Sequence, residues 1–360
     1  MDPQQIDNEQ QGIDINNPNN VQPEEDVTTN REAFYARYRF YQPRVAIGEG
    51  TYSTVYLVWD TVDRTDVALK RFNIQEDDQA ESFQRELGIL GQIGRDNDHT
   101  VPFLGHHQNV QNLTRSYLVL GEMWRTLDVE VQRKREIREW YSIDKIRRLG
   151  LQIANGLAFL EGLNIIHADL KPANLMFTNV YCDHLRISDF GNAFVRDTEI
   201  NHSIQTPEYR AMEVFLGLSP YTNVIDIWSF GCILVFMYCA THLFTAGTNN
   251  VDRDLVYDIV STIGMPPRGM LLSSHMSVIY FDFERGQFKM RLDVLEESER
   301  SMNSLNIEQF LHVHRQQQRR QEYRWFVELI NQMMDYNENR LNIAGIINHN
   351  FFTNPRAPRR

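Results

Sequence analysis

The sequence is poor in cysteine and has neither an apolar leader nor an apolar run of bilayer length. Its three cysteines are Cys182, Cys232 and Cys239. An odd number without metal-ligand spacing excludes a complete disulfide framework and indicates reduced thiols. The longest apolar run, 225–240, is shorter than the roughly 20 residues that span a bilayer, so it predicts a buried helix. We therefore expect an intracellular protein, in the cytoplasm, the nucleus or both, that does not enter a membrane.

Basic residues are also in short supply. The chain has 36 lysines and arginines against 48 aspartates and glutamates, which gives a net charge of −12. This balance argues against direct binding of nucleic acid or of anionic membranes, and it favours basic protein partners. Hydrophobic residues make up 42% of the 360 residues, enough for a substantial core. We expect a globular monomer.

The residue pattern divides the chain into a small β-rich part and a larger helical part. Residues 1–36 are polar and acidic, which predicts a disordered tail. Residues 37–120 combine a strand pattern over 38–72, a helical pattern over 77–93 and a strand at 116–120. Residues 121–353 are mostly helical, beginning with an amphipathic helix over 143–163, and they include an irregular insert at about 265–322. Residues 354–360 form a short basic tail.

Two motifs in the first part are consistent with phosphate binding. The stretch 47–55, "IGEGTYSTV", has Gly48 and Gly50 at a turn, where backbone N–H groups can approach phosphate oxygens. Lys70, on a later strand, is a suitable cation for phosphates if a carboxylate holds it, and Glu86 in the helix over 77–93 is the candidate. Taken alone, the same residues also fit an ordinary turn and an exposed helical glutamate.

The stretch 165–177, "IIHADLKPANLMF", carries a denser set of polar residues between two apolar runs. Asp169, Lys171 and Asn174 follow the order of a catalytic base, a phosphate-neutralising cation and a metal-binding amide. Fifteen residues beyond Asn174, Asp189 begins "DFG" and can supply a carboxylate to Mg²⁺. This spacing predicts a catalytic loop rather than a simple turn.

With "AME" (211–213) and "DIWSFG" (226–231) following in order, the chain resembles the eukaryotic protein kinases over residues 38–353. The resemblance implies a two-lobed α+β fold, with a β-rich N-lobe that has one main helix and a larger, mostly helical C-lobe. It implies transfer of the γ-phosphoryl group of ATP, with Mg²⁺, to protein hydroxyls. It also implies that Glu213 pairs with Arg340 and that Asp226 supports the catalytic loop from the helix beneath.

The resemblance assigns the site residues one by one. Asp169 is implied as the catalytic base, with Lys171, Lys70 and Glu86 as the other catalytic residues. Asn174 and Asp189 are implied as the magnesium ligands. The residues implied in nucleotide binding are Ile47, Gly48, Glu49, Gly50, Ser53, Val55, Ala68, Lys70, Leu120, Gly121, Glu122, Met123 and Leu175.

Within the kinases, "YRAMEVFLG" and the segment 265–322 resemble the CMGC group, and the SR-protein kinases most of all. Three stretches carry this resemblance, "GEGTYSTVYLVWD", "SDFGNAF" and "SIQTPEYRAMEVFLG". It implies basic substrates of the Arg/Ser-rich type, and Asp254 matches an acidic docking position. Dual-specificity and homeodomain-interacting kinases are the near alternative, but Ser203 occupies the position of their activating tyrosine.

Ala168 stands where most kinases have an arginine that pairs with a phosphate on the activation segment. An alanine cannot form that pair, and the arginine has no assigned step in phosphoryl transfer. We therefore expect an activation segment, 189–213, that is ordered by its own packing and needs no phosphorylation. The alternative is a catalytically weak pseudokinase scaffold, which the altered "HAD" and "AME" would fit.

Overall fold

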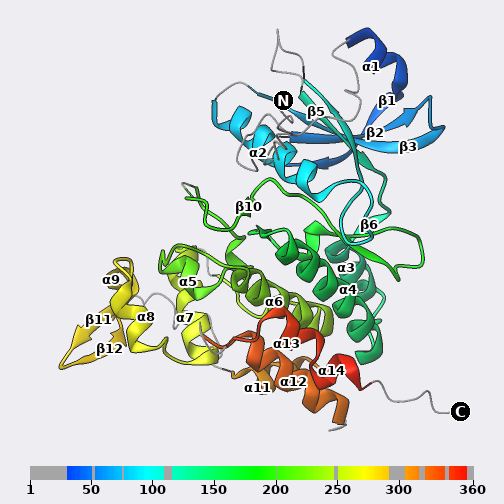
Figure 1. Cartoon of the computed structure of the whole chain (residues 1–360). Coiled ribbons are helices and arrows are strands. Elements are labelled where there is room, and N and C mark those ends of the chain that lie inside the picture. The colour runs from blue at the N-terminus through cyan, green and yellow to red at the C-terminus, as the bar shows by residue number, and fades with distance from the viewer. Residues whose placement is uncertain are drawn as a thin grey trace, which may run out of the picture.

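A computed structural model describes residues 31–50, 53–74, 77–108, 116–200, 202–246, 250–291, 305–315, 321–336 and 340–354. These residues form two lobes, a sheet with a crossing helix above and a larger helical body below (Figure 1). The expected α+β architecture is confirmed. Among the described residues, no helix combines the length and the hydrophobicity that crossing a membrane would require.

The N-lobe is a five-stranded antiparallel sheet with the strand order β1-β2-β3-β5-β4. Its strands are β1 (Tyr38–Glu49), β2 (Ser53–Asp60), β3 (Thr65–Phe72), β4 (Phe103–His107) and β5 (Ser116–Gly121). Helix α2 (Asp77–Ile93) spans the predicted residues and buries Phe83 completely. The hairpin, the third strand and the helix expected from the sequence are therefore confirmed.

The N-lobe begins earlier than the sequence predicts. Residues 31–36 belong to helix α1 (Arg31–Arg37), so the prediction of a disordered tail up to residue 36 is wrong for them. Phe34 is completely buried, and its ring stacks on that of His107 at 4.4 Å between centroids. Tyr35 and Tyr38 pack beside Phe34, so the aromatic cluster of this lobe begins before residue 37, where the prediction had placed its start. Residues 1–30 lie outside the described part of the chain.

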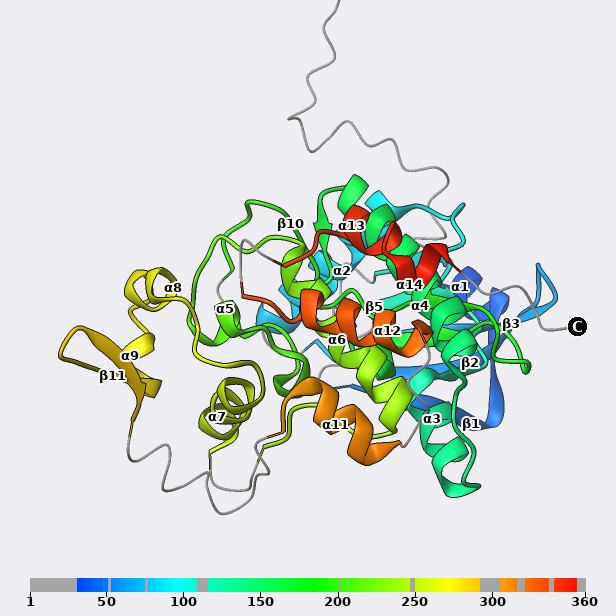
Figure 2. The ribbon, with the colours of Figure 1, turned by 90° about the horizontal axis from the view of Figure 1, so that it is seen from below.

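The C-lobe is built around α6 (Val224–Cys239), which packs against α4 (Ile143–Gly162), α11 (Ile307–His314) and α12 (Gln321–Met333) (Figure 2). All residues of α6 from Ile225 to Cys239 are buried, as expected for the run 225–240. The other C-lobe helices outside the insert are α3 (Leu127–Glu136), α5 (Met212–Phe215), α7 (Val251–Ile263), α13 (Ile343–Ile347) and α14 (Asn350–Thr353).

Two small sheets lie at the top of the C-lobe and carry the loops of the site. One pairs β6 (Arg125–Thr126), β8 (Leu175–Phe177) and β9 (Leu185–Ile187), and the other pairs β7 (Ile165–Ile166) with β10 (Phe194–Val195). Strand β5 ends at Gly121, one residue beyond the lobe boundary expected from the sequence. The boundary itself stays a prediction, as does the basic tail 354–360, of which only Asn354 is described.

The segment 265–322 is more regular than expected where the structure describes it. It contains α11, which packs on α6 and α12. It also contains α8 (Arg268–Ser273), α9 (Ser277–Tyr280) and a hairpin of β11 (Phe281–Glu284) and β12 (Gln287–Met290), and these three project from the C-lobe in both views (Figures 1 and 2). Arg285 and Gly286 turn this hairpin with φ angles of 51° and 83°, the left-handed pair that suits a two-residue turn. Residues 292–304 and 316–320 lie outside the described residues.

Candidate active site

The loop 167–174 is held from below by a buried carboxylate. Asp226, near the start of α6, accepts the backbone N–H groups of His167 at 2.8 Å and Ala168 at 2.9 Å. Burial raises the pKa of Asp226, and the two backbone hydrogen bonds act in the opposite direction. Ala168 has a left-handed backbone, φ 59°, which costs a non-glycine residue about 1–2 kcal/mol. The expected support of this loop by Asp226 is confirmed.

His167 links the loop to the segment that contains Asp189. Its Nδ1 accepts the backbone N–H of Asp169 at 3.2 Å, so the proton lies on Nε2, which donates to the Ser188 carbonyl at 3.0 Å. The ring is completely buried. His167 therefore fixes the spacing of Asp169 and Asp189, a structural part that the sequence did not assign.

The Asp169 carboxylate is bound on both oxygens. Lys171 Nζ contacts Oδ2 at 3.0 Å, while the hydroxyl and the backbone N–H of Thr206 donate to Oδ1 at 2.7 and 3.0 Å. Lys171 Nζ also donates to Thr206 Oγ1 at 2.9 Å. The three groups form a closed ring that draws the activation segment onto the catalytic loop. Thr206 was missed as a site residue, because its partner lies 37 positions earlier and no local pattern marks it.

Lys70 lies between two carboxylates. Its Nζ contacts both oxygens of Glu86 at 2.8 Å and Asp189 Oδ1 at 2.8 Å. Burial alone would lower the pKa of Lys70, but Asp189 and Glu86 together raise it. The charge of Lys70 lowers the pKa of Asp189 to about 2, whereas burial raises that of Glu86. Strand β3, helix α2 and the segment after β9 thus meet at one cation.

The residues expected around the nucleotide lie on connected strands. Val55 pairs with Lys70, and Ala68 pairs with Leu120, across the β2-β3-β5 ladder. Gly121 lies against Pro102, whose ring carbon would be 2.9 Å from an added Cβ. A side chain at 121 would therefore push the strand end away from Pro102. The pairing of β2, β3 and β5 therefore places the expected nucleotide-binding residues Val55, Ala68 and Leu120 on one sheet.

The rest of the expected nucleotide set lies at the strand ends. Gly50 and Ser53 exchange backbone hydrogen bonds at 2.8 and 3.4 Å, which makes the glycine-rich turn. Ile47 and Glu49 are exposed, and Gly48 is part-buried. Beyond β5, Glu122 is exposed and Met123 packs against the main core. Leu175 is completely buried at the start of β8.

Asn174 and Asp189 fit the donor set of a magnesium ion. The Asn174 amide nitrogen donates to the Asp169 carbonyl at 2.8 Å, which turns its oxygen away from that contact. The Asp189 side chain is 46% exposed, and Lys70 contacts only its Oδ1. One carboxylate and one amide oxygen, completed by phosphates and water, suit Mg²⁺. Among the described residues, no cluster of three or more His, Cys, Asp or Glu side chains suits a metal.

The activation segment is tied to the C-lobe core by Gln205. Its N–H donates to the Ala168 carbonyl at 2.7 Å, with φ 60°. Its side-chain nitrogen donates to the Ile225 carbonyl and to Ser229 Oγ, both at 2.9 Å, and its side-chain oxygen accepts the N–H of Ala211 at 3.0 Å. Both ends of this buried amide therefore have partners within the protein.

The end of the activation segment is fixed by an ion pair of Glu213 with Arg340. The two guanidinium nitrogens Nη1 and Nη2 of Arg340 each contact one carboxylate oxygen of Glu213, and the longer of the two distances, from Nη2 to Oε2, is 3.0 Å. The expected pair is therefore confirmed. The Arg340 side chain is completely buried. Met212, which replaces a proline of the family pattern, is also completely buried at the start of α5. The altered "AME" therefore leaves this anchor intact.

Comparison with known proteins agrees with this geometry. The protein kinase domain family matches residues 41–352. The chain is 29% identical over 251 residues to "Probable serine/threonine-protein kinase dyrk2" of Dictyostelium discoideum, which covers 70% of this chain and 27% of that protein. It is 33% identical over 233 residues to cyclin-dependent kinase B2-1 of Oryza sativa subsp. japonica, covering 63% of this chain and 70% of that protein.

Mitogen-activated protein kinase mpk-1 of Caenorhabditis elegans is 32% identical over 227 residues, covering 61% of this chain and 49% of the relative. The chain thus spans between about a quarter and about two thirds of the length of these relatives. All three are CMGC-group kinases. With the family matched over most of its length and the expected residues assembled in one site, the chain belongs to the protein kinase domain family.

Proposed function

We propose that the chain is a serine/threonine protein kinase that uses ATP and Mg²⁺. One observation carries the proposal: Asp169 is fixed through both carboxylate oxygens by Lys171 and Thr206, and its backbone carbonyl accepts a hydrogen bond from the amide nitrogen of Asn174, the candidate metal ligand. A base that takes a proton from a substrate hydroxyl must be held in place before the substrate arrives. A pseudokinase scaffold would have no need of these contacts.

Each residue then has a separate task. Asp169 orients the substrate hydroxyl and accepts its proton, and Lys171 offsets charge at the transferred phosphoryl group. Lys70, held by Glu86, binds the phosphates, while Asn174 and Asp189 would hold Mg²⁺. Bound Mg²⁺ neutralises charge that develops on the phosphate oxygens. The strands β1 to β3 and residues 120–123 would hold the nucleotide.

We propose basic substrates, of the Arg/Ser-rich type, and action inside the cell. The acid excess of the chain and the resemblance of "SIQTPEYRAMEVFLG" to SR-protein kinases support the substrate class. Asp254 does not contribute surface charge, because its side chain is buried. The three cysteines are buried free thiols, which suits a reducing compartment.

The test is ATP consumption by the wild type and by Asp169→Asn, with a matched set of Arg/Ser-rich, Pro-directed and acidic serine peptides. We expect the substitution to lower the rate about 10²–10⁴-fold, the contribution of a general base. The wild type should prefer the Arg/Ser-rich peptide. Equal rates from both proteins would establish the scaffold alternative, and preference for the Pro-directed peptide would overturn only the substrate class.

We also propose that the kinase is active without phosphorylation of its activation segment. Gln205 and Thr206 supply the hydrogen bonds that order the segment against the catalytic loop. Phosphatase-treated enzyme should keep its rate within about twofold, since no charge-assisted phosphate contact is required. A rate that collapses after phosphatase and returns when Thr198, Ser203 or Thr206 is phosphorylated would contradict this.

A further inference from the structure

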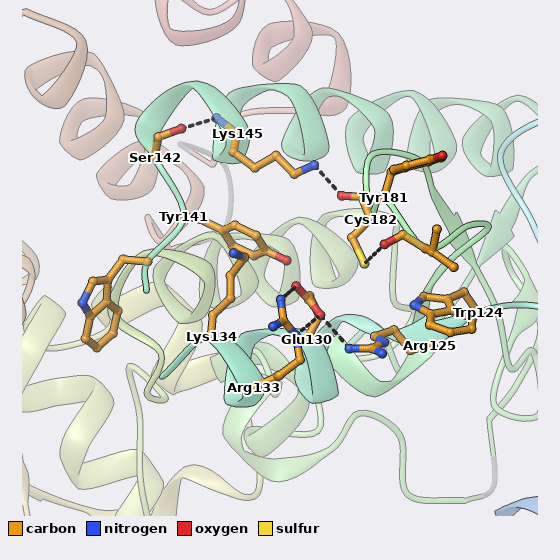
Figure 3. Close-up of a pocket in the computed structure, with 12 residues that line it drawn as sticks. Trp124, Arg125, Glu130, Arg133, Lys134, Tyr141, Ser142, Lys145, Tyr181 and Cys182 are labelled. Carbon is orange, nitrogen blue, oxygen red and sulfur yellow. Dashed lines mark hydrogen bonds and ion pairs between the residues drawn. The ribbon is translucent and has the colours of Figure 1, made fainter. Parts of the chain in front are cut away.

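A groove on the C-lobe lies outside the proposed active site. It encloses about 530 Å³ between α3, the start of α4 and the turn between β8 and β9. Figure 3 shows its lining side chains converging from these three elements. None of them belongs to the catalytic or nucleotide set, and its first residue, Trp124, follows directly after Met123. The volume is in the range of sites that hold a ligand or several side chains of a peptide.

The lining is cationic in a chain that is acidic overall. Four cationic side chains line the groove, Arg125, Arg133, Lys134 and Lys145, against one carboxylate. That carboxylate, Glu130, is buried and already contacts Arg125 at 2.9 Å and Arg133 at 2.7 Å. Its charge is therefore compensated within the protein. Glu139, outside the lining, pairs with Lys134 at 3.0 Å, so the four cations stand against two carboxylates and the groove keeps a net positive charge. Such a local patch attracts anionic groups despite the overall charge of −12.

The floor of the groove carries a hydrogen-bond donor without a partner. Tyr141 is 4% exposed, and its hydroxyl makes no hydrogen bond within the described residues. Its hydroxyl is directed toward the space between Glu130 and Cys182 (Figure 3). Buried hydroxyls in proteins are nearly always paired. An incoming carboxylate would supply the missing acceptor.

The rim of the groove is aromatic and exposed. Trp124 and Trp140 are 47% and 43% exposed, and Val180 and Tyr181 are 58% and 80% exposed. Tryptophan and tyrosine are the side chains that most often anchor a partner, because they bury a large area and keep a polar tip. The same groove therefore offers apolar contacts beside its cations.

We propose that this groove docks a partner protein through a short acidic segment with large apolar residues between its carboxylates. The carboxylates would lie against Lys134, Lys145 and the Tyr141 hydroxyl, and the apolar residues against the two tryptophans and Tyr181. Charge complementarity selects an acidic peptide over a basic one. Because large apolar side chains lie between the cations, the groove should bind an acidic peptide with apolar residues more tightly than a small inorganic anion. The inference goes beyond the proposed activity and concerns a second surface.

Fluorescence anisotropy of the full chain, without nucleotide, tests the proposal directly. The probe is a labelled glutamate-rich peptide with two leucines and a phenylalanine, compared with versions that carry glutamine or lysine in place of glutamate. We expect the glutamate peptide to bind at least about tenfold more tightly than the others, with weakening by salt. A photo-crosslinking version should label 127–136 or 178–184.

Three variants locate the binding. Tyr141→Phe removes only the unpartnered oxygen and should weaken binding about three- to tenfold, the range of one net hydrogen bond. Lys134→Glu reverses one cation and should weaken it about tenfold or more. Arg39→Gln, which removes a charge from an exposed position on β1, is the matched control and should change binding less than about twofold. Unfolding midpoints check that each variant is folded.

Three outcomes would overturn the proposal. The first is equal binding of the glutamate and lysine peptides. The second is a loss with Arg39→Gln as large as with Lys134→Glu. The third is that the glutamate peptide does not bind, whereas a single-stranded RNA of equal charge binds to the wild type and no longer binds to Tyr141→Phe and Lys134→Glu.

Discussion

Lys70 and Lys171 both pair with carboxylates in the site, but the two pairs are supported in different ways. The Lys70 pair consists of side chains alone, contributed by β3, α2 and the segment after β9. The Lys171 pair lies within a loop whose backbone is itself bound, through Asp226 below and Gln205 above. One arrangement depends on charges from elements that can move apart, and the other on fixed N–H groups.

This difference separates what can be adjusted from what is built in. Ion pairs respond to pH, salt and small displacements of a helix. Backbone hydrogen bonds to a buried carboxylate are shielded from salt, and they are not broken by a small displacement of a helix in the other lobe. We therefore expect the N-lobe contacts to be the adjustable part of the kinase and the loop 167–174 to be its fixed part.

The largest effect should come from breaking the fixed part. Asp226→Asn replaces a carboxylate that accepts two backbone N–H groups with an amide that carries its own donors. One buried N–H then loses its acceptor, so the unfolding free energy should fall by about 3 kcal/mol. Thermal and denaturant unfolding measure this. Thr222→Ala, at an exposed position just before α6, is the control for a local effect on the start of the helix, and a loss as large in that variant would contradict the assignment.

A smaller effect should follow from loosening the activation segment. Gln205→Ala leaves the N–H of Ala211 without its acceptor and frees the segment from α6. The rate should fall about tenfold, about 1.4 kcal/mol of activation free energy, because Thr206 no longer holds Asp169 continuously. Steady-state kinetics measure it. The Michaelis constant for ATP should stay unchanged, and a change there instead would place the defect in the N-lobe.

The smallest effect concerns the adjustable part and pH. The pKa of Asp189 is lowered from 3.8 to about 2 beside Lys70. Its ionised form therefore stabilises the fold above pH 3.8, and this stabilisation disappears as the pH falls through about 2. Because the side chain is 46% exposed, solvent screening keeps the contribution below about 1 kcal/mol. The difference in unfolding free energy between wild type and Asp189→Asn should shrink between pH 4 and 2, and a constant difference would contradict this origin.

Prediction from the sequence succeeded where a signal is local. The helices over 77–93 and 143–162 follow from apolar spacing within a few turns. The residues predicted as catalytic were found from short motifs and the family resemblance, and their roles stay predictions. Distant pairs such as Glu213 with Arg340 came only from the family resemblance, and a distant contact outside that pattern was missed. Thr206 reaches Asp169 across 37 positions, and its own neighbours give no sign of this.

Two other elements that the sequence analysis did not predict, helix α1 and the hairpin 281–290, have only weak signals in the sequence. Phe34 anchors α1, but it lies at the border between a long polar segment and the aromatic residues that begin at Tyr35. The hairpin 281–290 alternates apolar and polar residues around Arg285 and Gly286, but an arginine is an unusual residue for a left-handed turn position. The groove under Trp124 and Tyr181 could not be predicted, because its three walls come from separate parts of the chain.

The buried alanine at 168 also limits how control by phosphorylation could be introduced into this kinase. Its side chain is completely buried, and its carbonyl accepts the Gln205 N–H. An arginine introduced there would bring a long charged side chain to a completely buried position, beside the segment that Gln205 ties to α6. We therefore expect that a phosphate-dependent switch would need changes at both 168 and 205, because the arginine would have to be accommodated where Gln205 now orders the segment.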